Sequence, residues 1–205
     1  MLDELGDKIS NSVAVNVDNV DDNQKEIIKY FIVQILGEFI KLFLMIGLAY
    51  LLGVGKLFLI CVGAMLVYRV ASGGVHCKGH ISCFIASFIF FFGNIYASMY
   101  IRSVYLDYAY IVMLIFNLIV IHLYAPADTE MKPIVSKKLR RNLKILSYVS
   151  MFAMMIFGRF VITDITVRNI FIFGTFIQSI NMLPITYRLI GTKYGFRDGI
   201  FEPQI

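Results

Sequence analysis

Residues 81–100 have the sequence ISCFIASFIFFFGNIYASMY. A stretch of about twenty residues without charge is long enough for an α-helix to cross the hydrocarbon core of a bilayer. The whole chain has the same character, because 59% of its 205 residues are hydrophobic and 16% are charged. Soluble domains have about 45–50% apolar and about 25% charged residues. The composition excludes a disordered chain, a collagen-like repeat and a secreted disulfide scaffold, and it predicts an all-α integral membrane protein.

Other hydrophobic segments flank this one on both sides, which gives about six transmembrane segments in total. The other five are residues 30–53, 57–68, 104–124, 145–163 and 169–186. Segment 57–68 is short for a span, so we expect a tilted or re-entrant half-helix there. An acidic segment, residues 1–28, carries Ile9, Val13, Val17 and Val20 at helical spacing, which predicts an amphipathic surface helix. We therefore expect a membrane domain at 29–190 and a tail at 191–205.

Basic residues predict the orientation of the chain in the membrane. With six crossings, both termini share a side with residues 69–80 and with the hydrophilic loop 125–144. Fourteen of the 19 Lys and Arg residues then lie on that side and three on the other. Cytoplasmic loops are enriched in Lys and Arg, so we expect cytoplasmic termini. A re-entrant second segment would leave five crossings and require a new count.

Residues 76–83 hold two imidazoles and two thiols: His76, Cys77, His80 and Cys83. A thiol beside an imidazole is the minimal apparatus of nucleophilic catalysis. Cys83 begins a span, where the helix macrodipole favours a thiolate. On an unbroken helix His76 and Cys83 would lie about 10.5 Å apart along the axis, whereas His80 is at i,i+3 and would touch Cys83. Catalysis by His76 therefore requires a chain break, which Gly79 permits.

Other interpretations of these polar residues stay open. His76, His80 and Cys83 share a helical face, and zinc accepts such mixtures of ligands. Cys61 and Cys77 are expected to be packing residues, and three cysteines suggest no disulfide framework. Charges within the spans either pair to fix helix packing or mark a small transporter or channel subunit; they are Glu38, Lys41, Asp107 and Arg159.

Two motifs resemble those of a known family. Arg69-Val-Ala-Ser-Gly-Gly-Val-His76, followed by Cys83, is similar to the signature of the accessory gene regulator B (AgrB) proteins. Tyr124-Ala-Pro-Ala-Asp-Thr129 with Lys132-Pro-Ile134 is similar to a second family motif. Length, hydropathy and the six-segment layout also match. One departure is that relatives often carry a lysine cluster before Pro133, whereas here Glu130 and Met131 precede Lys132 and the basic run lies downstream.

The resemblance implies a cysteine endopeptidase in the cell membrane of a Gram-positive bacterium, acting in quorum sensing. It implies a substrate similar to AgrD, a pro-peptide whose acidic tail is removed as a thiolactone or lactone ring forms. By this resemblance Cys83 would be the nucleophile and His76 the base, supported by Arg69, Gly73 and Gly74. His80, which helix geometry favours, is not part of the family motif and stays the alternative base. No cofactor, metal or nucleic acid is implied, and a homodimer is compatible with so small a bundle. We expect the acidic tail to be drawn to the basic side chains of Lys132, Lys137, Lys138, Arg140, Arg141 and Lys144.

Overall fold

The computed structural model describes residues 22–77, 79–101, 106–130 and 133–195. The predicted surface helix, Lys132 and most of the predicted tail lie outside these residues, as do the side chains of His80 and Asp107. The chain divides into two compact units, with a boundary between Gly53 and Val54. The described part of the first unit is the helix α2 (Asp22–Leu51) with the turn that follows it. In α2, Lys41 pairs with Glu38 at 2.5 Å, so the pairing expected of the charges within spans is present here.

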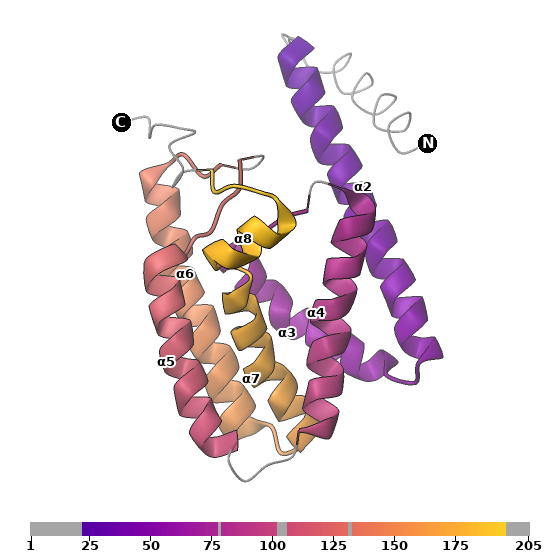
Figure 1. Ribbon diagram of the computed structural model, residues 1–205, viewed down its shortest axis with the longest axis vertical. Coiled ribbons are helices and arrows are strands. Elements are labelled where there is room, and N and C mark those ends of the chain that lie inside the picture. Colours follow the sequence, from indigo (N-terminus) through magenta and orange to yellow (C-terminus); the bar gives the residue numbers. More distant parts are fainter. Residues whose placement is uncertain (1–21, 78, 102–105, 131–132, 196–205) are drawn as a thin grey trace. The chain divides into compact units, whose positions relative to one another are not determined.

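The second unit is a bundle of helices with short links. It contains α3 (Gly55–Ser72), α4 (His80–Tyr100), α5 (Leu106–Tyr124), α6 (Lys137–Ile156), the π-helix η1 (Phe157–Val161), α7 (Ile165–Ile180) and α8 (Pro184–Ile190). Figure 1 shows α4, α5, α6 and α7 running alternately down and up within this unit. The described residues form no β-strand, and an isolated bridge joins Gly73 to Ala127. The predicted all-α fold is confirmed.

Three described helical stretches are long and apolar enough to cross a membrane: Gly55–Ser72, Ile81–Tyr100 and Lys137–Val161. The pair α7 and α8 would be a fourth if it is one span, although it bends by 73° at the break between the two helices. Helix α5 is apolar but shorter over its described part, Tyr108–Tyr124. Most of the described residues in each predicted segment from 57 onward therefore lie in helix, and most of 30–53 lies in α2.

Two boundaries differ from the sequence-based expectation. Helix α3 has 18 residues, not twelve, because Arg69 stays helical and its side chain donates to the backbone beyond the helix end. The predicted sixth segment breaks at residues 181–183, and Pro184 then opens α8. A proline disfavours the helical conformation in the residue before it and is well accommodated in the first turn of a new helix.

Helix α7 lies at the centre of the bundle and contacts α3, α4, α5 and α6. Polar side chains link it to three of these neighbours inside an otherwise apolar core. Tyr68 of α3 bonds Ser179 at 3.0 Å, Asn94 of α4 donates to the carbonyl of Ile170 at 3.2 Å, and Asn117 of α5 donates to Thr175 at 3.0 Å. Such bonds act as specific links where the surroundings offer only apolar contacts.

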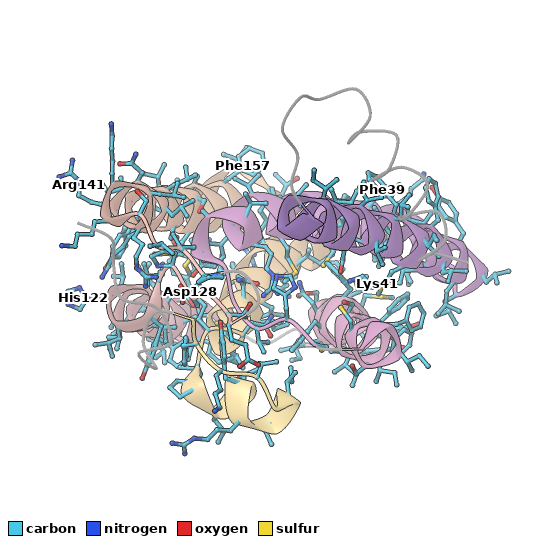
Figure 2. All side chains as sticks on the ribbon, turned by 90° about the horizontal axis from the view of Figure 1, so that it is seen from above. Phe39, Lys41, His122, Asp128, Arg141 and Phe157 are labelled. Atoms are coloured by element: carbon cyan, nitrogen blue, oxygen red, sulfur yellow. The ribbon has the colours of Figure 1, made fainter. Side chains whose placement is uncertain are left out.

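Three connecting stretches meet at one end of this bundle: residues 73–77 with 79, residues 125–130 with 133–136, and residues 181–195, which include α8 (Figure 1). We call them together the loop cluster. Figure 2 views the molecule from above and shows Asp128 of this cluster among the helices, whereas Arg141 projects outward from α6. Both sequence motifs noted above fall within or beside the loop cluster, so their residues meet here.

Candidate functional site

The first motif leaves α3 through a pair of glycines. Gly73 has φ +70° and Gly74 has φ +123°, values that L side chains rarely adopt. The amide of Gly74 donates to the carbonyl of Ala127 at 2.7 Å, and the amide of Ala127 donates to that of Ser72 at 2.8 Å. A Cβ added to Gly73 would lie 2.2 Å from the Ala127 oxygen. Glycine at position 73 therefore lets the two motifs approach closely enough to form their bridge.

Val75, the residue before His76, is held from two sides. The Arg69 guanidinium donates to its carbonyl at 2.6 Å, and its amide donates to the carbonyl of Asn181 at 3.1 Å. A Cβ on Gly74 would lie 2.5 Å from Nη1 of Arg69, so glycine also makes room for that guanidinium. Arg69, Gly73 and Gly74 thus fix the backbone that carries His76.

A side chain near the end of helix α7 binds the same turn. The Gln178 amide donates to the hydroxyl of Ser72 at 2.8 Å and to the carbonyl of Gly73 at 2.7 Å. Gln178 is 1% exposed, so both bonds are made away from water. A buried amide with two good acceptors orders the backbone at that point.

The second motif is held by a buried carboxylate. One oxygen of Asp128 accepts from the Arg140 guanidinium at 2.9 Å and from the amide of Ile134 at 3.0 Å. The Asp128 side chain is 1% exposed and that of Arg140 is 20% exposed. The Tyr187 hydroxyl donates to the Asp128 carbonyl at 2.9 Å, and its ring stacks on Tyr194 with centroids 3.9 Å apart. The chain after α8, predicted as a polar tail, also packs on the second motif, because the ring of Tyr194 stacks on that of Tyr124 with centroids 6.5 Å apart.

His76 and Cys83 lie on opposite sides of a chain break. His76 belongs to the link between α3 and α4, and it is half-buried. Gly79 has the extended conformation, with φ −113° and ψ 148°, and caps α4. Cys83 is half-buried in the first turn of α4, with its amide donating to the Gly79 carbonyl at 3.0 Å. The break that His76 requires is thus present at Gly79, and the 10.5 Å separation of an unbroken helix does not apply.

The other candidate residues of this segment have separate places. His80 is the first residue of α4, three residues before Cys83. Cys77 is half-buried in the link. Cys61 is fully buried between α3 and α4, where it accepts from Asn94 at 3.3 Å, in line with the packing role expected of it. The described residues contain no group of three His, Cys, Asp or Glu side chains placed to hold a metal ion, and the His80 side chain lies outside that set.

The basic run divides into two kinds of side chain. Lys137, Lys138 and Arg141 are exposed around the first turns of α6, which contain no acidic residue. Arg140 is engaged with Asp128, and Lys144 donates to the His122 carbonyl at 2.6 Å. Among the described basic residues of this run, Lys137, Lys138 and Arg141 therefore present their charge outward.

Three buried polar atoms of the loop cluster have no hydrogen-bond partner among the described residues. They are the hydroxyl oxygens of Thr129 and Thr192 and the side-chain carbonyl oxygen of Asn181. Buried polar groups are nearly always paired in folded proteins, and an unpaired one costs about 1–3 kcal/mol.

Sequence reasoning missed several residues that build this region. Asp128 belongs to the second motif, whereas no pattern in the sequence points to Gln178, Asn181 or Tyr187. Gln178 lies 105 residues from Gly73, so no local spacing could connect the two. The one local signal is the acidic Asp128 within an aromatic and proline-containing motif.

The fold and the site together define an all-α membrane protein whose two sequence motifs are joined at one end of a helical bundle. The family model of Accessory gene regulator B matches residues 6–182, and the chain belongs to that family. It is 29% identical over 154 residues to a putative AgrB-like protein of Clostridium acetobutylicum, covering 75% of this chain and 72% of the relative. It is 27% identical over 154 residues to accessory gene regulator protein B of Staphylococcus aureus, covering 75% and 79%. No solved structure matches the chain.

Proposed function

We propose that this protein is a membrane-embedded cysteine endopeptidase that removes the C-terminal tail of an AgrD-like pro-peptide and closes a thiolactone or lactone ring. The observation that carries the proposal is the chain break at Gly79, which puts His76 in a link and Cys83 in the first turn of the next helix. Without that break, the two residues would be held two helical turns apart and the pair could not react together.

The proposed reaction has two transfers. His76 accepts the proton of the Cys83 thiol, and the thiolate attacks the scissile carbonyl carbon of the substrate. The peptide C–N bond breaks, the tail leaves as an amine that takes the proton from His76, and an acyl-thioester remains on Cys83. A substrate thiol or hydroxyl then gives its proton to His76 and attacks the thioester. The ring bond forms, and Cys83 leaves as a thiolate that takes the proton back.

The surroundings support this assignment in two ways. The backbone before His76 is fixed by Arg69 and Asn181, and a base positioned in this way loses little freedom on reaching its target. The exposed Lys137, Lys138 and Arg141 offer positive charge to an acidic tail. By the distribution of basic residues, we place this end of the bundle on the cytoplasmic side of the cell membrane.

The test is cleavage of the pro-peptide by purified protein in vesicles, followed by mass spectrometry. Cys83→Ser and His76→Ala should each reduce tail release to background while the protein keeps its helical content. Cys77→Ser and His122→Ala are the matched controls and should retain activity. An acyl adduct on Cys83 should accumulate when the ring-closing side chain of the substrate is replaced by alanine. Undiminished cleavage by Cys83→Ser would remove the nucleophile from the proposal.

His80→Ala separates the two candidate bases. We expect only a modest loss, because the family resemblance assigns the base to His76. Complete loss in His80→Ala together with normal activity in His76→Ala would transfer the role to the i,i+3 partner of Cys83. Elemental analysis of the purified protein tests the zinc alternative independently of either variant.

A further inference from the structure

The short helix α8 presents two large aliphatic side chains on its outer face. Ile185 and Leu189 lie one helical turn apart and are 62% and 81% exposed. The opposite face of the helix, with Thr186 and Tyr187, is buried against the rest of the protein. Figure 2 shows α8, in pale yellow, at the outer edge of the second unit. The proposed peptidase reaction uses neither aliphatic side chain, so their exposure needs another explanation.

The direction of α8 matches that of a helix lying along a membrane surface. Figure 1 shows α7 running alongside α5 and α6, so α7 shares the direction of the spans. The axis of α8 turns by 73° from that of α7. A helix at that angle to a span runs close to the plane of the bilayer. Amphipathic helices in this orientation place their apolar face at the boundary between headgroups and acyl chains.

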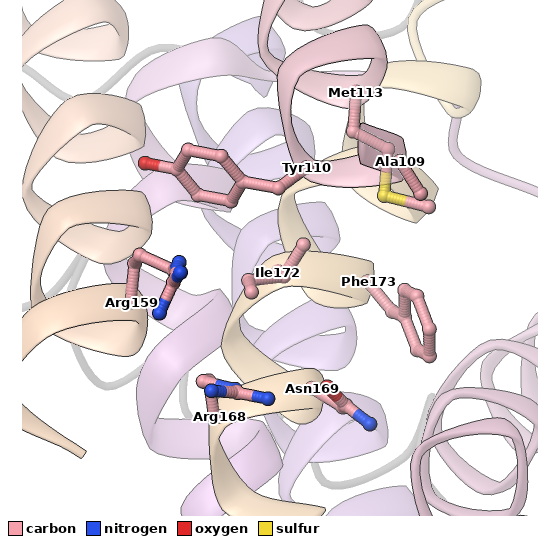
Figure 3. Close-up of a pocket in the computed structure, with 8 residues that line it drawn as sticks. All are labelled: Ala109, Tyr110, Met113, Arg159, Arg168, Asn169, Ile172 and Phe173. Carbon is pink, nitrogen blue, oxygen red and sulfur yellow. The ribbon is translucent and has the colours of Figure 1, made fainter. Parts of the chain in front are cut away.

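The length of α7 sets the depth at which α8 begins. The first end of α7 is polar, because the exposed Asp164 caps it, and Figure 3 shows Arg168 at this end with Arg159 on the neighbouring segment. From this polar boundary the 16 residues of α7 extend about 24 Å, at a rise of about 1.5 Å per residue. The hydrocarbon core of a bilayer is about 30 Å thick. Helix α8 therefore begins about 6 Å inside the other boundary, which matches the depth of about 5–10 Å at which interfacial helices lie.

The bend between α7 and α8 keeps its backbone bonded to protein groups. The carbonyl of Ile180 accepts from the amide of Leu183 at 3.0 Å and from the hydroxyl of Thr186 at 2.7 Å. The carbonyl of Asn181 accepts from the amide of Val75 at 3.1 Å. Irregular backbone at membrane depth is tolerated only where it is buried in protein or faces a water-filled cavity. The bend is thus suited to a position just inside the bilayer boundary, and its bonds fix the direction of α8.

We propose that α8 is an interfacial helix whose binding partner is the bilayer itself, on the side of the loop cluster. Ile185 and Leu189 insert among the acyl chains just below the headgroups, while the exposed Arg188 extends its guanidinium to the level of the phosphates. On the buried face, the Tyr187 hydroxyl donates to the Asp128 carbonyl at 2.9 Å. The lipid contact of α8 therefore fastens the second motif at the membrane surface.

The experiment uses tryptophan as a depth probe, because the chain contains none of its own. Full-length Leu189→Trp and Ile185→Trp are reconstituted separately in phosphatidylcholine vesicles that carry bromine either near the headgroup end or near the methyl end of an acyl chain. The shallow bromine should quench the fluorescence of each variant at least about twofold more strongly than the deep bromine, because interfacial helices lie about 5–10 Å into the boundary. Ile115→Trp, 53% exposed near the middle of α5, is the matched control and should show the reverse order.

Three results would overturn the proposal. Stronger quenching by the deep bromine at both positions would mean that α7 and α8 form one broken span. Fluorescence that aqueous iodide quenches and neither bromine affects would place α8 in water. Fluorescence that neither iodide nor bromine affects would mean that another part of the chain, or a second copy, covers the outer face. None of these measurements involves the pro-peptide, so their outcome is independent of the proposed peptidase activity.

The link from α8 to the second motif has its own test. Ile185→Gln with Leu189→Gln should weaken the lipid contact, so the amides of Ala127 and Glu130 should exchange hydrogen several fold faster in vesicles than they do in the parent protein. Ile81→Gln, 78% exposed in the first turn of α4, is the matched control and should leave this exchange unchanged. Unchanged exchange in the double variant would mean that the lipid contact does not fasten the second motif.

Discussion

Polar side chains have different tasks in the helical body and in the loop cluster of the second unit. In the body, Asn94 and Asn117 each link two helices whose own backbones are already hydrogen-bonded. In the loop cluster, Arg69 and Gln178 bind backbone carbonyls that belong to no helix. Loss of a link in the body removes one contact, whereas loss in the cluster leaves a buried backbone group unpaired. The cluster should therefore be the more sensitive of the two regions.

The largest effect on stability is expected from Arg140→Ala. This change removes the guanidinium 2.9 Å from the buried Asp128 carboxylate. Breaking a buried ion pair on one side costs about 3–5 kcal/mol. Thermal or denaturant unfolding in detergent should show this loss, whereas Arg141→Ala, one residue away and exposed, should change stability by less than about 0.5 kcal/mol. Similar stability for both variants would mean that the Asp128–Arg140 pair does not hold the second motif.

The next largest effect is expected from Gly73→Ala. The new Cβ would meet the Ala127 oxygen, and the positive φ would be strained as well. Together these costs amount to about 3 kcal/mol. Gly93→Ala is the matched control, because nothing lies within 4 Å of its new Cβ. Pro-peptide cleavage and stability against unfolding should both be reduced in the first variant and near normal in the second.

Hydropathy was sufficient to predict the helical body, because each span must be long and apolar enough for the bilayer. It could not locate the break after α7, although Pro184 and the residue before it carried a local signal for it. Nor could it predict the extension of α3 through Arg69, since that arginine is satisfied by a carbonyl beyond the helix end. The short second segment was thus underestimated.

The candidate site, like the fold, was predictable only in part from the sequence. Simple helix geometry favoured His80, whereas the resemblance favoured His76 and required a break that the structure places at Gly79. The bridge between residues 73 and 127 joins segments far apart in the chain, so no spacing rule could predict it.

Replacing one amide with leucine in each region compares the two directly. Gln178→Leu removes bonds to Ser72 and to the Gly73 carbonyl, and about 1–3 kcal/mol of stability should be lost. Asn94→Leu removes the bonds with the Ile170 carbonyl, Cys61 and Ser98 within the body, and links of that kind contribute about 0.6 kcal/mol each on average. Cleavage should fall in Gln178→Leu and stay close to normal in Asn94→Leu. The reverse order in either measurement would contradict the distinction between body and cluster.

The smallest effect concerns the exposed part of the basic run and separates attraction of the substrate from support of the fold. Lys137 and Lys138 are exposed at the start of α6, whereas Arg140 beside them is bound to Asp128. Lys137→Gln with Lys138→Gln should leave stability unchanged and lower kcat/KM for an acidic-tailed peptide by a few fold at low salt. Raising the ionic strength should remove most of the difference, since exposed charges are screened over about 8–10 Å. A peptide with a neutral tail should be cleaved equally by the variant and the parent protein. If the variant were equally impaired on both peptides at every salt concentration, these lysines would support the fold of α6. Electrostatic steering requires a charged peptide tail, so it cannot explain a loss on the peptide with a neutral tail.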